Sequence, residues 1–188
     1  MGDNHEYYLM NPPRIHAMIV AAGRGSRFGA SIAKQYTMLQ GQTLLQRSVA
    51  RLADSKYIDQ CLLVIAADDS VAQTLNFAMP IHYANGGAER WQSVRAGVAA
   101  IGKAGADDAD LVLIHDAARP AVPRHDIDRV IEAAMMEPYG AILATPVADT
   151  LKVSFTESEL IDQGLDKRKT NTYAKRTIDR SNMWQAQT

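Results

Sequence analysis

An apolar strand that passes directly into a basic, glycine-rich loop is the feature that most constrains this chain. Residues 15–22 form the apolar run, and the loop 23–29 (GRGSRFG) follows at once. Glycines allow a tight turn and leave backbone N–H groups close to an anion, which is how α/β proteins hold phosphate. Arg24, Arg27 and Lys34 add positive charge around the turn, and such cations suit charge that grows in a transition state.

The loop departs from two better-known phosphate-binding motifs. It is not a Walker A sequence, because no Gly-Lys-Ser/Thr closes it. Gly23 and Gly25 begin like a dinucleotide fingerprint, but Phe28 stands where the third glycine would be. A dinucleotide-dependent oxidoreductase is therefore an alternative that Phe28 disfavours, and a plain glycine turn with solvated arginines is the structural alternative.

Apolar runs typical of buried strands alternate with segments of helical spacing. We expect strands at 15–22, 61–66, 81–84, 111–114 and 141–144, helices at 44–53, 89–101 and 126–136, and a short helix that is capped by 68–70 and reaches 77. The alternation predicts an α/β fold with a doubly wound, mostly parallel (Rossmann-like) sheet. Ligands bind outside the carboxyl ends of such strands, so the Gly23 loop, the turn 85–87 and His115-Asp116 should share one edge.

The pattern changes after Pro146. Residues 150–155 alternate like an exposed strand, 156–172 are polar and charged, and 177–180 return toward a second short strand. We expect a protruding β-hairpin arm at about 148–180, too polar to have a core of its own, that finds its apolar partner on another subunit. A surface insertion is the alternative.

Size and charge fit one domain, residues 15–188, after an N-terminal extension at 1–14. The chain has 188 residues and a net charge of −1, which favours neither nucleic-acid nor membrane-surface binding. No stretch approaches a membrane span, and the N-terminus lacks the features of a signal peptide. The single cysteine, Cys61, rules out an intrachain disulfide and fits a cytoplasmic protein. The histidines show no metal-ligand spacing, so we expect no protein-bound metal site.

Six sequence blocks stand in the order found in one enzyme family. They are Ala21-Ala22-Gly23-x-Gly25-x-Arg27, Lys34-Gln35-Tyr36, Gly86-Gly87-x-Glu89-Arg90-x-x-Ser93-Val94, His115-Asp116-Ala117-Ala118-Arg119-Pro120, Pro146-Val147-x-Asp149-Thr150-x-Lys152 and Asp179-Arg180-x-x-x-Trp184-x-Ala186-x-Thr188. Together they resemble the 2-C-methyl-D-erythritol 4-phosphate cytidylyltransferases. The ribitol-5-phosphate cytidylyltransferases are similar in the first loop, and the stretch 116–120 favours the methylerythritol branch.

The resemblance implies a nucleotidyltransferase of non-mevalonate isoprenoid biosynthesis. Such enzymes transfer CMP from CTP to a sugar-alcohol phosphate and release pyrophosphate, with Mg²⁺ held mainly by the CTP phosphates. The acceptor phosphate is already anionic, so catalysis is positioning plus charge neutralisation. The family also shares its active site within a homodimer, because an arm crosses from each subunit to its partner.

The resemblance also assigns residues to roles. Arg27 and Lys34 would be catalytic, stabilising phosphate charge in the transition state. Groups that would bind CTP are Ala21, Ala22, Gly23 and Gly25 by backbone, Gly87, Arg90 and Ser93 around the cytosine, and Asp116 and Ala117 at the ribose. Groups that would bind the sugar phosphate are Asp116, Arg119, Thr150, Arg180 and Thr188, with Thr150 and Arg180 supplied by the partner's arm.

Two departures from the family pattern bear on activity. Ala88 stands where an acidic residue often follows the Gly-Gly pair, and a backbone contact survives that change whereas a side-chain contact does not. Family members continue beyond the position of Thr188 with a segment that carries a lysine for the sugar phosphate, and we expect that lysine to be missing. A CTP-binding chain without turnover is therefore a second alternative.

Overall fold

The chain forms two compact units. The computed structural model describes residues 12–23, 33–156 and 172–187. One unit ends at Leu143, and the second comprises Ala144–Gln187. The single-domain boundaries predicted from the sequence stay a prediction.

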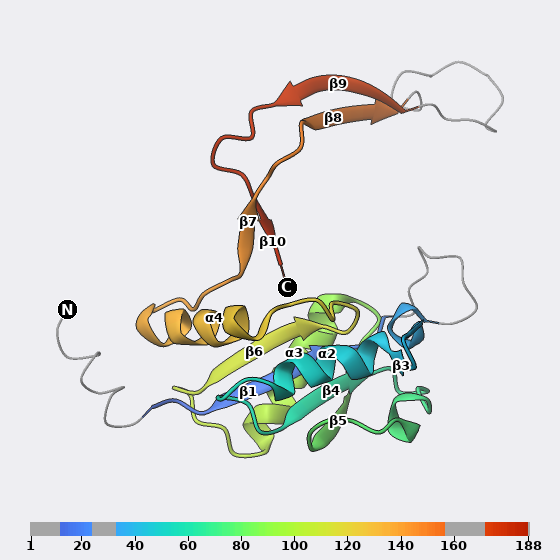
Figure 1. Cartoon of the computed structure of the whole chain (residues 1–188), viewed down its shortest axis with the longest axis vertical. Helices are drawn as coiled ribbons and strands as arrows, with labels where there is room; N and C mark the ends of the chain where they lie inside the picture. The colour runs from blue at the N-terminus through green and yellow to red at the C-terminus, as the bar shows by residue number, and fades with distance from the viewer. Residues whose placement is uncertain (1–11, 24–32, 157–171, 188) are drawn as a thin grey trace. The chain divides into compact units, whose positions relative to one another are not determined.

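A four-stranded parallel sheet is the centre of the first unit (Figure 1). Its strands, in spatial order, are β5 (Ile81–Asn85), β4 (Cys61–Ile65), β1 (Ile15–Val20) and β6 (Leu111–Asp116). The chain therefore adds β4 and β5 on one side of β1 and then crosses to place β6 on the other side. This order confirms the predicted α/β, doubly wound fold.

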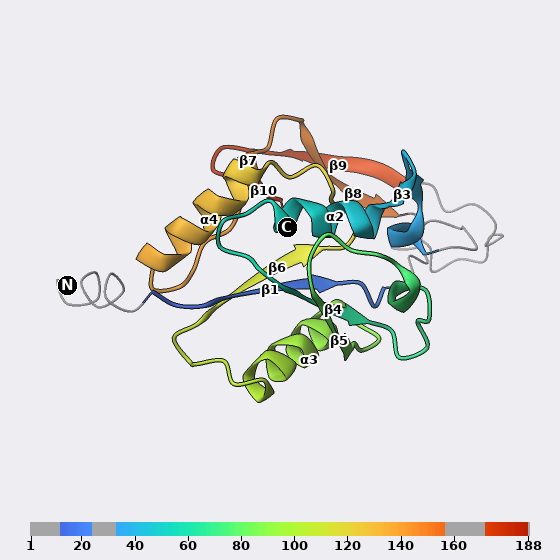
Figure 2. The same cartoon turned by 60° about the horizontal axis from the view of Figure 1, so that its bottom comes forward.

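Helices cover both faces of the sheet (Figure 2). Helices α2 (Leu44–Ala53) and α4 (Arg124–Met136) lie on one face, and α3 (Arg90–Lys103) lies on the other. Strand β1 supplies side chains to both cores by alternation, because Ile19 packs with the α2 side and Met18 with the α3 side. Burial on both faces explains why the strands read as continuous apolar runs.

Short elements lead into α2. The 3₁₀ turn η2 (Lys34–Tyr36) is followed by β2 (Met38–Leu39) and β3 (Gln42–Thr43), which pair as an antiparallel ribbon. Its two-residue turn places Gln40 and Gly41 at φ +49° and +81°, which is the geometry of a type I′ turn. Thr43 then caps α2 in a capping box with Gln46, so the predicted helix start is confirmed.

Two predicted elements were wrong, one in length and one in pairing. The helix expected to reach residue 77 is only the 3₁₀ turn η3 (Ala72–Thr74), because the Asp69 carboxylate binds the first backbone N–H groups in a local turn. The fifth parallel strand does not form, and β7 (Ala144–Pro146) instead pairs antiparallel with β10 (Trp184–Ala186). That partner lies about forty residues away along the chain, beyond the reach of local periodicity.

The second unit consists of two antiparallel ribbons, β7 with β10 and β8 with β9 (Figure 1). Strand β8 (Leu151–Thr156) pairs with β9 (Thr172–Ile178), with Leu151 opposite Ile178 and a register shift after Val153. The hairpin predicted at about 148–180 is therefore present. Its second strand begins earlier and ends earlier than the predicted 177–180, because the ladder with β8 sets its length.

Within the described ranges, no helix has both the length and the apolar character needed to cross a membrane.

Helix α3 contains one glycine in a crowded position, Gly97, and one in open space, Gly102. Alanine at the first position tests core packing, and alanine at the second tests helix propensity alone. A Cβ at Gly97 would clash with the Met18 sulfur and lie 2.8 Å from Val64 Cγ2, whereas a Cβ at Gly102 would meet nothing within 4 Å. We expect Gly97→Ala to lower the free energy of unfolding by about 1–3 kcal/mol, because it overpacks the core under α3. The matched change Gly102→Ala should raise it by up to about 1 kcal/mol. Urea unfolding of both variants measures this, and equal effects would contradict the packing described for α3.

Candidate active site

The predicted ligand-binding segments meet where the strand order reverses. Strand β1 is flanked by β4 and β6, and Val20 lies level with Asp116 in the ladder. Directly beyond β1, the Ala21 N–H donates to the Val64 carbonyl at 2.8 Å. Beyond β5, the Gly86 N–H donates to the Ile65 carbonyl at 2.7 Å. Ligands of doubly wound sheets bind at this reversal of strand order, outside the carboxyl ends.

The start of the glycine loop is held by a buried glutamine. Gln35, 6% exposed, donates from Nε2 to the carbonyls of Ala21 at 2.9 Å and Gly23 at 3.3 Å. Because both acceptors flank the loop entrance, this side chain ties the loop to the turn that carries Lys34. Lys34 itself lies exposed in η2. The hydrogen bonds of Gln35 therefore hold the turn that carries Lys34 against the predicted CTP-binding backbone at 21–23.

The Gly86-Gly87 turn packs directly on that loop entrance. A Cβ at residue 86 would lie 2.5 Å from the Ala22 Cβ and 2.7 Å from the Ser93 Oγ, so only glycine fits there. Ser93 is 1% exposed, and its hydroxyl accepts from the Gly87 N–H at 3.1 Å. The same hydroxyl lies 3.3 Å from the carbonyls of Gly87 and Glu89 as a donor. Ser93 therefore fixes the turn against α3, and its contact with cytosine stays a prediction.

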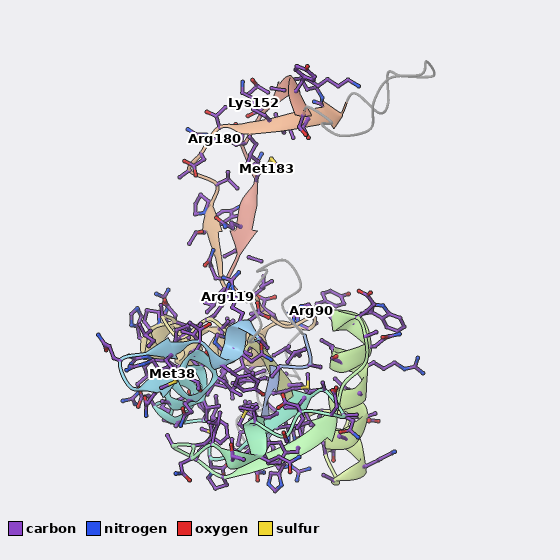
Figure 3. The ribbon with its side chains drawn as sticks, turned by 90° about the vertical axis from the view of Figure 1, so that its right-hand side faces the viewer. Met38, Arg90, Arg119, Lys152, Arg180 and Met183 are labelled. Atoms are coloured by element: carbon purple, nitrogen blue, oxygen red, sulfur yellow. The ribbon has the colours of Figure 1, made fainter. Side chains whose placement is uncertain are left out.

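Asp116 joins two arginines at the end of β6. Its carboxylate forms ion pairs with Arg90 Nη1 at 3.1 Å and with Arg119 Nε at 3.3 Å. Figure 3 shows Arg90 and Arg119 at one edge of the first unit. The side chains are 52%, 43% and 33% exposed for Arg90, Arg119 and Asp116, so the pairs contribute little to stability. Their value is geometric: one carboxylate orients two guanidinium groups, each a planar donor suited to phosphate.

A buried histidine and a buried serine hold the turn that follows Asp116. His115 lies 3.0 Å through Nε2 from the Arg119 carbonyl, which can only accept, so Nε2 carries the proton. Ser48, fully buried on α2, donates to the Ala117 carbonyl at 3.1 Å. Desolvation lowers the pKa of His115 from its ordinary value, against the opposing effect of the hydrogen bond to Arg119. The imidazole is therefore a neutral donor.

Five further predicted residues are not part of the described first unit. Gly25, Arg27 and Thr188 fall outside the described residues. Thr150 and Arg180 belong to the second unit. Arg180 begins a β-turn in which the Met183 N–H donates to its carbonyl at 3.0 Å and Asn182 takes φ +66°.

An open groove of about 360 Å³ lies beside this turn within the second unit. It is lined by Pro146, Val147, Ala148, Arg180, Ser181, Asn182, Met183 and Trp184. Arg180, Met183 and Lys152 are labelled in Figure 3. The lining of the groove thus combines a cation, Arg180, with apolar residues such as Val147 and Trp184.

Three residues that organise the site were given no catalytic or binding role from the sequence: Gln35, Ser48 and His115. Ser48 had a detectable signal, since it lies on the buried stripe of α2 beside Leu45, Val49 and Leu52. Gln35 and His115 stand next to predicted site residues, but their acceptors are backbone carbonyls that no motif reveals. They position the site rather than present groups to a ligand.

Among the described residues, no three His, Cys, Asp or Glu side chains gather as a metal site. The carboxylate at the candidate edge is Asp116. Mg²⁺ prefers oxygen ligands and keeps several waters, so one carboxylate together with ligand phosphates suffices to hold it. The residues present therefore fit a nucleotide-borne Mg²⁺.

Comparison with known proteins follows this geometry. The family model described as "IspD: 2-C-methyl-D-erythritol 4-phosphate cytidylyltransferase" matches residues 15–188. A curated relative of that name from Psychrobacter arcticus is 68% identical over 98% of this chain and 73% of its own length. Another from Psychrobacter cryohalolentis is 66% identical over 100% of this chain and 75% of its own. The chain thus spans about three quarters of the length of these relatives.

Solved structures of the same family are similar to this chain as well. A crystal structure of a 4-diphosphocytidyl-2C-methyl-D-erythritol synthase superposes with a TM-score of 0.73 at 32% identity, over 94% of this chain and 72% of that one. The Francisella tularensis cytidylyltransferase gives 0.67 at 28% identity, over 93% and 70%.

His115 predicts a pH dependence of stability. Its folded-state pKa is lowered, so the unfolded chain binds a proton first as the pH falls below about 6.5. We expect the free energy of unfolding to fall between pH 7 and pH 5 more steeply for the wild type than for His115→Gln, which keeps an N–H donor but cannot titrate. Urea unfolding at several pH values measures the difference, and parallel curves would show that His115 is not held neutral.

Proposed function

The chain belongs to the 2-C-methyl-D-erythritol 4-phosphate cytidylyltransferase family, and from this membership we propose that it transfers CMP from CTP to 2-C-methyl-D-erythritol 4-phosphate and releases pyrophosphate. It is a transferase, more narrowly a nucleotidyltransferase, of isoprenoid biosynthesis. The observation that carries the proposal within the structure is the meeting of the glycine-loop entrance, the Gly86-Gly87 turn and Asp116 at the reversal of strand order.

The reaction needs no strong general base. A phosphate oxygen of the acceptor attacks the α-phosphorus of CTP, and the bond from that phosphorus to the bridging oxygen of pyrophosphate breaks. The attacking oxygen is already anionic, so no proton must be removed from it. What the protein must supply is alignment of the two reactants and positive charge around crowded phosphates.

The described residues can supply both the alignment and the positive charge. Lys34 lies in the turn that Gln35 ties to the loop entrance, and its ammonium would neutralise charge on the phosphates of CTP. Arg27, in the glycine loop, takes the same role in the proposal. Asp116 orients Arg90 and Arg119, so the guanidinium groups are set in place before substrate arrives. Such preorganisation lowers the cost of reaching the transition state.

Mg²⁺ would be carried mainly by the CTP phosphates, and Asp116 is the carboxylate that would hold it on the protein side. When bound, the ion screens phosphate charge and orients the departing pyrophosphate.

The arm supports a homodimer in the proposal. In the β8–β9 ladder, Leu151, Val153 and Ile178 fall on one face together with Arg176, while Lys152 and Thr177 fall on the other, where Lys152 Nζ donates to Thr177 Oγ1 at 2.6 Å. A two-stranded ribbon is marginal alone and needs a partner surface. We propose that a second copy of the chain covers it.

Thr150 and Arg180 flank the same end of this ladder. Leu151 pairs with Ile178, so Thr150 precedes the first pair and Arg180 follows it by two residues. Both can therefore reach one sugar phosphate together, and in the proposal they reach the site of the partner subunit. The localisation that fits this chemistry is the cytoplasm, where CTP and the acceptor are made.

Turnover tests the proposed reaction. With CTP, Mg²⁺ and 2-C-methyl-D-erythritol 4-phosphate, we expect stoichiometric pyrophosphate release that EDTA abolishes. Lys34→Ala should lower kcat on the order of 100-fold with little change in the Kd for CTP, because it removes a donor used in the transition state. Lys103→Ala is the control, because it lies at the far end of α3, about 20 Å from Arg90 along the helix, and should leave kcat unchanged.

The same assay separates the alternatives. An equal rate with ribitol 5-phosphate would favour the pentitol-phosphate enzyme. CTP binding by calorimetry without pyrophosphate release would favour the binding chain without turnover. Equal affinity for ATP and CTP would contradict recognition of cytosine.

Mixing variants tests the shared site. An Arg180→Ala chain and an Arg27→Ala chain should each be nearly inactive, whereas a mixed dimer regains both arginines in one of its two sites and should have about half the wild-type activity. Mixed dimers isolated with two affinity tags provide the measurement. No recovery of activity, or a monomer by light scattering at assay concentration, would contradict a site shared between subunits.

A further inference from the structure

The turn that carries Lys34 is anchored by the two side chains that follow it. Gln35 reaches the carbonyls at the entrance of the glycine loop. Tyr36 donates its hydroxyl to the carboxylate of Asp69, in the loop between β4 and β5. A 3₁₀ turn places consecutive side chains about 120° apart. Lys34 therefore stands on a single turn whose other two residues are fastened to different parts of the first unit.

Asp69 is itself a fixed acceptor. Its Oδ1 accepts from the Val71 N–H at 3.0 Å and the Ala72 N–H at 3.2 Å, so its second oxygen remains for Tyr36. Its own N–H donates to the Ala66 carbonyl, directly beyond β4, at 3.0 Å. The contact therefore connects the Lys34 turn to the end of a central strand of the sheet.

The loop around Asp69 has little freedom to follow Tyr36 if the turn moves. Ala72 is fully buried, and its carbonyl accepts from the Tyr83 hydroxyl at 3.2 Å. Tyr36 packs its half-buried ring against the main core. Desolvation and the hydrogen bond to Asp69 raise the pKa of Tyr36, so its hydroxyl stays a donor.

We propose that Tyr36 and Asp69 are positioning residues for Lys34: their hydrogen bond fixes the turn so that the ammonium meets the phosphate charge of the transition state. This inference rests on the proposed function. In this proposal both residues act through Lys34 and not by contact with substrate. Phosphoryl transfer of this kind depends on alignment, and a displacement of about 1 Å at a cation can cost on the order of 100-fold in rate.

The competing explanation is that the bond only stabilises the fold. The chain offers a matched pair for comparison, because Tyr57 donates its hydroxyl to Glu132 at 2.7 Å. That pair also joins a tyrosine to a carboxylate, but it links the segment after α2 to α4. Tyr36→Phe and Tyr57→Phe each remove one hydroxyl and leave the ring in place.

The test is a double-mutant cycle on turnover. Tyr36→Phe should lower kcat about tenfold in the wild type, with the KM for CTP and the thermal midpoint nearly unchanged. In the Lys34→Ala background the same change should lower kcat less than about twofold, because the group that it positions is gone. Tyr57→Phe should leave kcat unchanged in both backgrounds. Asp69→Asn, which alters the other side of the bond, should reproduce the dependence on Lys34.

Each contrary outcome is distinguishable. An equal fractional loss in both backgrounds, or a loss of kcat that follows the thermal midpoint, would assign Tyr36 and Asp69 to stability alone and overturn the inference. An unchanged kcat in Tyr36→Phe would overturn it as well. If wild-type protein does not turn over CTP with the methylerythritol phosphate, the proposed function itself fails, and the wild-type assay shows that before any variant is compared.

Discussion

The pairing of β1 with both β4 and β6 is the constraint on which the candidate site depends. It places the ends of β4 and β6 within hydrogen-bonding distance of β1, on its two sides, and it sets Val20 level with Asp116. The glycine loop can then begin beside the Gly86-Gly87 turn, and that approach requires the missing side chain at Gly86. A change in this register would separate the nucleotide-binding segments even if each kept its local conformation.

Around that edge, buried polar side chains hold the loops in place, and exposed charged side chains are proposed to bind substrate. Gln35, Ser48 and Ser93 are buried, and their polar groups bind backbone carbonyls and N–H groups of the loops. Buried polar groups satisfied in this way hold the loops in one conformation. The exposed charges, Asp116 with Arg90 and Arg119, are therefore carried on loops that stay in place.

The second unit, unlike the first, has no hydrophobic core among its described residues. Its ribbons have too little apolar surface to form a core, and Trp184 is 63% exposed and Tyr173 is 43% exposed. Such a unit gains its stability by covering one face with another surface. This links assembly to catalysis in the proposed function, because the residues at the open end of the β8–β9 ladder are those assigned to the sugar phosphate.

The sequence alone determined helices α2, α3 and α4, the four strands of the parallel sheet, the hairpin arm and the family, because each follows from local periodicity, capping or motif order. Thr43 and Gln46 mark the start of α2, and the apolar run at Cys61 marks a central strand. Only the tertiary structure decided that β7 leaves the parallel sheet for β10, and that Gln35, His115 and Asp69 support the site. The reason is that their partners are backbone groups, side chains or strands that the local sequence does not specify. Local periodicity cannot predict such pairings.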